Sequence, residues 1–230
     1  MSWPDPTASN TLAVNYGQDA DNLPPPDQVV GIIESISAAK VKIYSTDASV
    51  LTAFKGTGIS LVVGTLNSDI APLAQQSGYA AEWIETNVLA FYPGTEIIGI
   101  VVGNEVFGDQ ASPSTMGLVL PAMQNVRSAL ASLGLQRQIF VSTAHSFSTL
   151  SASYPPSAGA FYASIAEQYM RPVLQFLSDS EAPFLINVYP FFAYKDNPST
   201  VSLQYALFQS NAGILDPTSG LRYYNMFDAQ

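Results

Sequence analysis

Short runs of apolar, β-branched residues alternate with longer segments of helical period along most of this 230-residue sequence. That alternation is typical of repeated βα units around a parallel sheet. The runs are almost continuously apolar, as expected when both faces of a parallel strand are covered. They lie at 11–17, 39–45, 59–67, 97–108, 137–144 and 182–192. The pattern predicts an α/β fold with six βα units in one large domain.

Helical segments are expected after most of these runs, beginning near Asp27 and near Ala48 and then spanning 80–91, 114–133 and 162–177. Asp27 is a candidate N-cap, and Gly134 closes the fourth segment as a C′ residue. The pattern breaks after Phe192. Residues 193–224 indicate a loop or a small hairpin over the mouth of a barrel, and "YYNMFDAQ" at 223–230 reads as the start of another helix.

Composition excludes several classes of function. The formal net charge is −10, and no stretch gathers Lys or Arg, so we expect no nucleic-acid partner. No apolar run approaches the ~20 residues that cross a bilayer, and the first ten residues do not read as a signal peptide. Without cysteine, thiol chemistry is excluded. Only 11 % of residues are charged, so Ser, Thr, Asn, Gln and Tyr must cover much of the surface, which suits neutral polar ligands.

Each apolar run turns polar or aromatic at its C-terminal end. In a β/α barrel the C-terminal ends of the strands form the active-site face, so these side chains are expected to converge on one cleft. The residues concerned are Asn15, Tyr16, Tyr44, Asn67, Asn104, Glu105, Ser142, Thr143, Asn187 and Tyr189.

Glu105 is the sharpest of these signals, because it directly follows the apolar stretch "IIGIVVGN". Burial there would disfavour the ionised carboxylate, raise its pKa and fit it for general acid work near neutral pH. The alternative is a loop carboxylate that only bonds to nearby backbone. Asn104 beside it could hold a substrate hydroxyl or could simply close the turn.

Aromatic residues at the strand ends have two readings. Tyr16, Tyr44, Tyr189, Phe191 and Phe192 could offer flat faces to sugar rings, or they could be ordinary core residues. Their shared position at strand ends favours the first reading.

His145 is the only histidine, so a multi-histidine metal site is excluded. A hydrogen-bonded structural histidine is expected there rather than a catalytic one. Serines lie nearby, but the sequence contains no G-x-S-x-G elbow, and it has neither the dinucleotide nor the P-loop glycine pattern. We therefore expect no metal and no cofactor.

Several blocks together resemble a known family. "AVNYGQDADNLPPPDQVV", "KIYSTD", "VVGTLN", "IVVGNEV", "VSTAHS", "YPPSAGAF" and "INVYPFFAY" occur in the order and spacing of the plant β-1,3-glucanases of glycoside hydrolase family 17. The resemblance implies a (β/α)8 barrel of the TIM type, of which about six βα units fall in this chain. It implies a partial catalytic barrel over 11–230, with 1–10 as a flexible N-terminal segment.

The same resemblance implies roles for individual residues. The family is expected to cleave internal bonds of β-1,3-glucans such as callose with retention of configuration. Its acid/base glutamate, in the "VGNE" block, matches Glu105, and Asn104 is implied as the neighbour that supports the sugar ring at the cleavage point. The substrate groove is expected to include Tyr16, Tyr44, Asn187, Tyr189 and Phe192. Lys42 stands where the family usually has arginine. The resemblance further implies a monomer located outside the cell or in the cell wall.

One block of the family's pattern does not occur in this sequence. The nucleophilic glutamate lies in a "SESGWP"-like block after the seventh strand, and we expect it to lie outside this chain. Glu167, Glu181 and Asp228 do not stand where a seventh strand would end. Three hypotheses stay open: a piece of a retaining β-1,3-glucanase, a protein that binds β-glucan without cutting it, and a fragment that does not fold alone.

Overall fold

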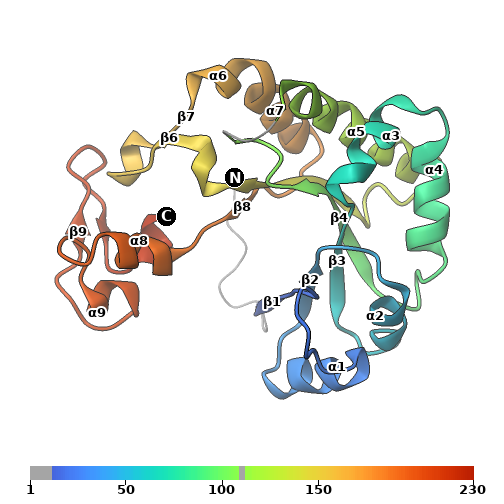
Figure 1. Ribbon diagram of the computed structural model, residues 1–230, viewed down its shortest axis with the longest axis horizontal. Coiled ribbons are helices and arrows are strands. Elements are labelled where there is room, and N and C mark those ends of the chain that lie inside the picture. Colours follow the sequence, from blue (N-terminus) through green and yellow to red (C-terminus); the bar gives the residue numbers. More distant parts are fainter. Residues whose placement is uncertain (1–11, 109–111) are drawn as a thin grey trace.

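The fold is built on one parallel sheet, seen in a computed structural model that describes residues 12–108 and 112–230. Six strands lie in the order β1-β2-β3-β4-β5-β8, and each neighbouring pair is parallel (Figure 1). The six parallel strands confirm the prediction from the apolar pattern, and they form a half-barrel, in agreement with the partial barrel that the resemblance implied. The strands are β1 (Ala13–Tyr16), β2 (Lys40–Ile43), β3 (Ser60–Gly64), β4 (Ile97–Asn104), β5 (Phe140–Ser146) and β8 (Leu185–Asn187).

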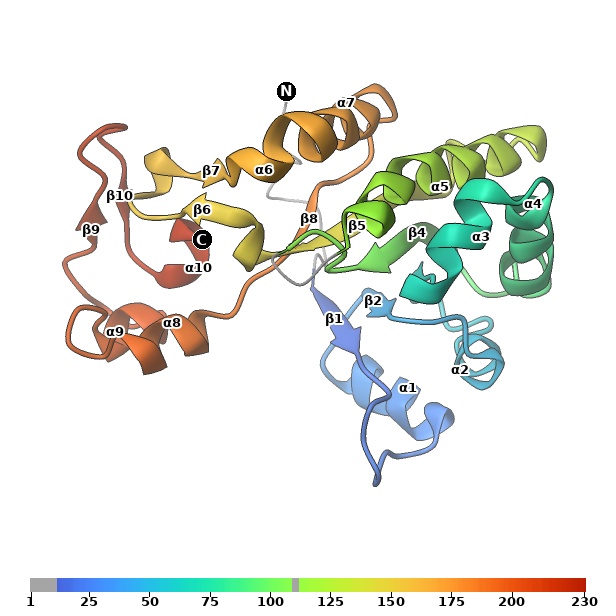
Figure 2. The same ribbon diagram turned by 45° about the horizontal axis from the view of Figure 1, so that its top comes forward.

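Helices follow the strands and line one side of the curved sheet (Figure 2). Side chains of both layers form one apolar cluster, in which Val41, Leu61, Ile100 and Met123 are fully buried. This burial is what makes the apolar runs fold as strands covered by helices. The helices are α1 (Pro26–Ser35), α2 (Ala48–Ala53), α3 (Ile70–Gln75), α4 (Tyr79–Ile84), α5 (Pro113–Ser132), α6 (Ala163–Ile165) and α7 (Arg171–Asp179).

Two expectations about element boundaries are wrong. Asp27 is not an N-cap, because α1 begins at Pro26 and Asp27 lies in its first turn, where a carboxylate still favours the helix dipole. The sixth strand is short, Leu185–Asn187, and residues 190–196 are helical instead of extended. Pro190 explains the change, since proline suits the first position of a helix and cannot donate to a sheet ladder.

An outer lobe, which we define as residues 147–161 and 188–230, lies beside the sheet in both ribbon views (Figures 1 and 2). The predicted hairpin after Phe192 and the helix near the last residues are both present there. The lobe contains β6 (Leu150–Ala152), β7 (Ala160–Phe161), α8 (Pro190–Asp196), α9 (Leu203–Ala206), β9 (Ile214–Leu215), β10 (Arg222–Tyr223) and α10 (Met226–Ala229). The expected flexible segment, 1–10, lies outside the described residues.

Candidate active site

Glu105 follows the last residue of β4, where the backbone leaves the extended conformation. Gly103 and Glu105 both have positive φ, +68° and +56°. A Cβ on Gly103 would lie 2.7 Å from Ile70 Cδ1, so this position also requires the absence of a side chain. The Glu105 N–H donates to the carbonyl of Ala144 on β5 at 2.8 Å. The turn therefore presents the carboxylate at the C-terminal edge of the sheet.

Asn187, at the end of β8, joins this turn through its side chain. Its Nδ2 donates to Glu105 Oε1 at 2.7 Å and contacts Asn104 Oδ1 at 3.3 Å. Three residues singled out from the sequence therefore meet, although Asn187 lies 82 positions after Glu105. Strand β5 lies between β4 and β8 and pairs with both, so the ends of β4 and β8 are two strands apart at the same edge of the sheet.

The side chain of Glu105 is exposed, and the burial expected from its place after an apolar strand is not observed. The apolar stretch is buried through Gly103, but the turn carries the next residues out of the sheet. The sequence argument for a buried carboxylate is therefore wrong.

Lys42 and Tyr44 extend the polar edge along β2. Lys42 is partly buried, and its Nζ lies 4.0 Å from the centroid of the Tyr44 ring, in cation–π contact. Burial lowers the pKa of Lys42, and the charge of Glu105 acts in the opposite direction. Burial also raises the pKa of Tyr44, with smaller contributions from Tyr189 and Glu105. These four groups therefore share one electrostatic neighbourhood.

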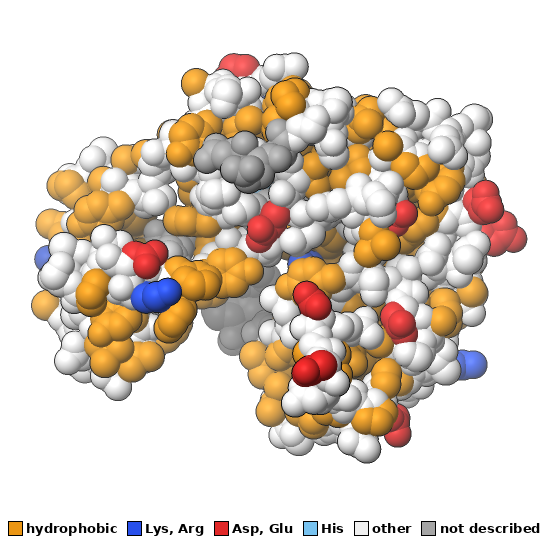
Figure 3. Space-filling model, viewed as in Figure 1, with side chains coloured by type: hydrophobic (Ala, Val, Ile, Leu, Met, Phe, Trp, Pro, Cys, Tyr) orange, Lys and Arg blue, Asp and Glu red, His pale blue; other side chains and the backbone are white. Residues whose placement is uncertain are grey.

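Aromatic side chains from the start of α8 stand exposed on the outer lobe. Tyr189 and Phe192 have ring centroids 5.6 Å apart, and Phe191 lies 5.4 Å from Phe192. Figure 3 shows a hollow between the outer lobe and the rest of the molecule, with apolar side chains on its lobe side. Tyr16 differs from these residues, because it belongs to the buried core with 9 % exposure.

His145 is fully buried on β5, between aromatic rings. Its ring stacks on Phe184 at 4.9 Å and lies 5.4 Å from Phe107. Neither ring nitrogen has a hydrogen-bond partner in the described part of the chain, so the expected hydrogen bond is not observed. Burial lowers the pKa of His145 to about 4, which keeps the ring neutral near pH 7. The ring is held by its aromatic neighbours instead.

Carboxylates elsewhere near the strand ends have structural partners. Asp47 caps α2 by accepting from the N–H groups of Ser49 and Val50, at 2.9 and 3.1 Å. Asp69 accepts from the N–H of Leu66 at 3.0 Å. Within 12–108 and 112–230, no cluster of three His, Asp or Glu side chains could hold a metal ion.

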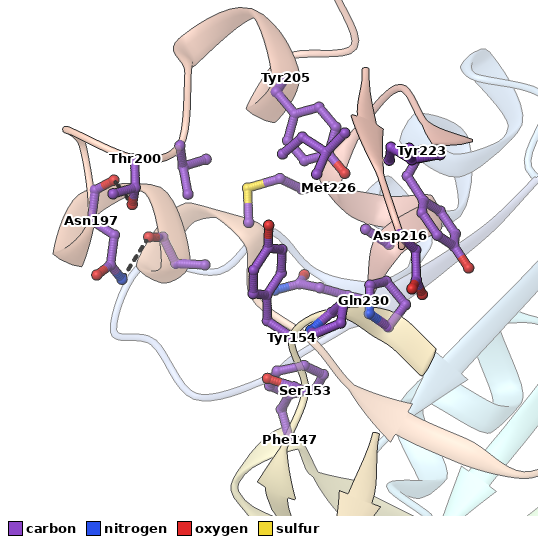
Figure 4. Close-up of a pocket in the computed structure, with 17 residues that line it drawn as sticks. Phe147, Ser153, Tyr154, Asn197, Thr200, Tyr205, Asp216, Tyr223, Met226 and Gln230 are labelled. Carbon is purple, nitrogen blue, oxygen red and sulfur yellow. Dashed lines mark hydrogen bonds between the residues drawn. The ribbon is translucent and has the colours of Figure 1, made fainter. Parts of the chain in front are cut away.

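A second hollow lies inside the outer lobe (Figure 4). It has a volume of about 530 Å³ and is lined by Tyr154, Tyr205 and Met226 among others, with Asp216 at its edge. Glu105 and the other predicted site residues do not line it. The predicted site and this cavity are therefore separate features.

Asn67 is the functional candidate that the sequence pattern left without a role. It was recognised only as a polar strand end, yet its side chain contacts the backbone of Asn104 with both polar atoms, at 2.7 and 3.0 Å. Its position could have indicated this role, because Asn67 lies three residues after the end of β3, the strand that neighbours β4.

Comparison with known proteins gives consistent matches over nearly the whole chain. The model of the "Glycosyl hydrolases family 17" matches residues 12–230. "Glucan endo-1,3-beta-glucosidase 7" of Arabidopsis thaliana is 45 % identical over 228 residues, which are 99 % of this chain and 45 % of that protein. "Glucan endo-1,3-beta-D-glucosidase" of Olea europaea is 45 % identical over 221 residues, which are 95 % of this chain and 47 % of that protein. The chain thus spans about half the length of these relatives.

A solved structure agrees in fold as well as in sequence. The β-1,3-glucanase and allergen of Cryptomeria japonica pollen superposes with a TM-score of 0.88 at 38 % identity, over 95 % of this chain and 67 % of that one. Sequence and fold therefore lead to the same conclusion. This chain belongs to glycosyl hydrolase family 17 and is similar to its glucan endo-1,3-β-glucosidases.

Proposed function

We propose that Glu105 is the general acid/base of a site that hydrolyses internal β-1,3-glucosidic bonds. The observation that carries this proposal is the contact of Asn187 with Glu105, which holds an exposed carboxylate at the C-terminal edge of the sheet. In a β/α barrel that edge is where catalytic groups stand. The names of the relatives supply the substrate class.

The proposed reaction proceeds with retention. Glu105 protonates the oxygen of the leaving sugar while a second carboxylate attacks the anomeric carbon, and Glu105 then takes a proton from the water that releases the glycosyl group. The two carboxyl groups must be roughly 5 Å apart. We propose that the second one lies outside these residues, because the family's "SESGWP"-like block does not occur in the sequence. Asp47 and Asp69, two carboxylates near the strand ends in the described part of the chain, are engaged in backbone contacts.

The remaining site residues are proposed to hold the glucan. Asn104 and Asn187 offer amides to sugar hydroxyls, while Tyr44, Tyr189 and Phe192 offer aromatic faces that are partly open to solvent. Tyr16 lies in the buried core, and we propose that it packs beneath these residues and does not contact the glucan itself. The surface suits an uncharged polysaccharide.

The proposal is tested by release of reducing ends from laminarin. The assay uses a longer protein that joins these residues to the part carrying the second carboxylate, because the mechanism needs both groups. In that protein we expect hydrolysis to fall by about 10²- to 10⁴-fold in Glu105→Gln, because the isosteric amide cannot transfer the proton. Glu82→Gln, an exposed glutamate on α4, is the matched control and should leave the rate unchanged. Measurable hydrolysis that is equal in Glu105→Gln and in the unaltered protein would exclude Glu105 as the acid.

A second candidate function is binding of β-glucan without cleavage. The exposed aromatic groups on α8 favour it, because they do not depend on a second carboxylate. Retention on laminarin without reducing ends, together with a cooperative thermal transition, would support this alternative. A broad transition with aggregation would instead indicate a chain that does not fold alone.

Location outside the cell or in the cell wall is proposed from the family alone. Along the part of the chain that the structure describes, no helix is long and apolar enough to cross a membrane. Fractionation of plant tissue with an antibody to the chain would test the location.

A further inference from the structure

The turn at the end of β4 adopts a conformation that neighbouring groups must hold in place. Glu105 has a φ of +56°, a region that residues with side chains rarely occupy. Such a conformation persists only where surrounding contacts determine it. Identifying those contacts shows what aims the Glu105 carboxylate.

The backbone ladder between β3 and β4 ends before this turn. Its last pair of residues is Gly64 with Val101, after which the N–H of Thr65 donates to the carbonyl of Val101 at 2.9 Å. Beyond this point, side chains provide the hydrogen-bond partners of the β4 backbone. The N–H of Gly103 donates to Thr65 Oγ1 at 3.0 Å, in place of a backbone acceptor.

At the next residue of the turn, Asn104, the side chain of Asn67 likewise takes the place of a backbone partner. Its Oδ1 accepts from the N–H of Asn104 at 2.7 Å, and its Nδ2 donates to the carbonyl of Asn104 at 3.0 Å. One side-chain amide therefore satisfies both backbone groups of Asn104, much as a neighbouring strand would. On the other side, the N–H of Glu105 is held by the carbonyl of Ala144.

These contacts separate the groups that hold the turn from the groups that face a substrate. The amide of Asn67 bonds to the backbone of Asn104, whereas the side chain of Asn104 faces Asn187. The Asn67 oxygen is also 3.0 Å from where a Cβ of Gly103 would stand, so the two residues fit closely.

We propose that Asn67 is a positioning residue for catalysis, which clamps the backbone of Asn104 and thereby aims the carboxyl group of Glu105. This inference rests on the proposed role of Glu105 as the acid/base. Asn67 acts through the backbone and has no proton-transfer role of its own.

Asn67→Ala removes both clamp bonds, and Asn67→Asp keeps only the acceptor. Asn125→Ala is the matched control, because Asn125 on α5 also uses its amide on backbone, donating to the carbonyl of Leu73 at 2.8 Å. In a longer protein that also carries the second carboxylate, we expect the kcat on laminarin to fall about ten- to a hundredfold in Asn67→Ala, with KM within about twofold, because misplacing a catalytic group by about 1 Å costs this much. Asn67→Asp should lose activity to a similar extent, since its carboxylate oxygen would oppose the carbonyl of Asn104.

The outcome that would overturn the proposal is a pure stability effect. If Asn67→Ala and Asn125→Ala lower the Tm alike and both keep the kcat of the unaltered chain, the clamp is merely structural. If Glu105→Gln keeps full activity, the proposed function fails first, and the clamp must be judged by a measurement that does not use hydrolysis.

That measurement is the NMR spectrum of the Glu105 carboxyl carbon and of the Asn187 side-chain amide, which donates to this carboxyl group. We expect Asn67→Ala to move or broaden both signals, because the contact between the two side chains is displaced, whereas Asn125→Ala leaves both unchanged. Identical spectra of these groups in all three proteins would overturn the proposal even if the chain hydrolyses no glucan.

Discussion

At the scale of single residues, His145 shows how burial changes what a side chain can do. The ring is fully buried against Phe184 and Phe107, and neither nitrogen is hydrogen-bonded within the described residues. Protonation would place an uncompensated charge in an apolar site, which is why burial lowers its pKa to about 4. Its titration therefore acts on stability and has no place in the proposed hydrolysis.

The stability of the fold should decrease in acid because of this residue. An unfolded His145 binds a proton below pH 6.5, whereas the folded form does so only near pH 4, so the unfolded state takes up more protons in this window. The free energy of unfolding should be undiminished above pH 6.5 and fall by up to about 3 kcal/mol as the pH drops to 4. Urea unfolding at several pH values measures this slope, and His145→Phe should flatten it. A slope that persists in the variant would assign it to other groups.

At the scale of elements, the strands that carry the site approach one another closely. A Cβ on Gly64, the last residue of β3, would lie 2.8 Å from the backbone oxygen of Tyr44. Backbone atoms cannot rotate away as a side chain can, so the space beside Gly64 is needed for β2 and β3 to pair near their C-terminal ends. Tyr44 belongs to the predicted substrate groove, and Gly64 therefore helps to determine the position of Tyr44 in that groove.

We expect Gly64→Ala to lower the free energy of unfolding by about 1–3 kcal/mol, because the added methyl group overpacks a site with no free space. Gly31→Ala is the matched control: Gly31 lies in the exposed interior of α1, and nothing stands within 4 Å of its added Cβ. That variant should gain about 0.5–1 kcal/mol, the advantage of alanine over glycine in a helix. Equal unfolding midpoints for both variants would contradict the close approach.

At the scale of the whole molecule, the sheet with its helices and the outer lobe are held together differently. The apolar cluster of the half-barrel runs from Tyr16 to Leu177 and does not include the buried lobe residues Tyr205 and Met226. Polar contacts also link segments of the lobe. The buried carboxylate of Asp216 accepts from the N–H and the hydroxyl of Ser157, at 2.8 and 2.7 Å, and so ties two distant segments of the lobe together.

This contact also shapes the titration of Asp216. Burial alone would raise the pKa of Asp216, but the hydrogen bonds from Ser157, Thr218 and Ser219 outweigh it and lower the pKa to about 2. The contribution of this carboxylate to stability is therefore present above pH 3.8 and is lost as the pH falls towards 2. Its window lies below that of His145, so the two effects can be separated.

Hydrogen exchange should distinguish the half-barrel from the outer lobe. We expect amides of β2, β3 and β4 to exchange only on global unfolding, and amides of α9, β9 and β10 to exchange sooner, because fewer buried apolar groups protect them. Asp216→Asn should accelerate exchange in the outer lobe and lower its unfolding temperature by several degrees, with β2–β4 unchanged. Uniform protection across the chain would show that the lobe and the half-barrel unfold as one unit.

The amino-acid sequence by itself determined the order of strands and helices and the place of Glu105 after the fourth strand. These features depend on local patterns, since strands covered on both faces need continuous apolar runs and helices need a period of 3.6 residues. Predictions of strand length and of side-chain burial from local sequence patterns were less accurate, because tertiary packing also decides them. Pro190 started a helix inside an expected strand, and Glu105 turned out to be exposed.

Only the tertiary structure decided which polar groups meet. The side chain of Asn187 reaches Glu105 across 82 positions, and that of Asn67 clamps Asn104 across 37. Such contacts depend on strand neighbours, on their stagger and on the positive φ of Glu105, none of which a local pattern encodes. The sequence pattern could identify the carboxylate, but the contacts that hold it depend on the order of the strands in the sheet, where β3 lies beside β4 and β8 lies one strand beyond β5.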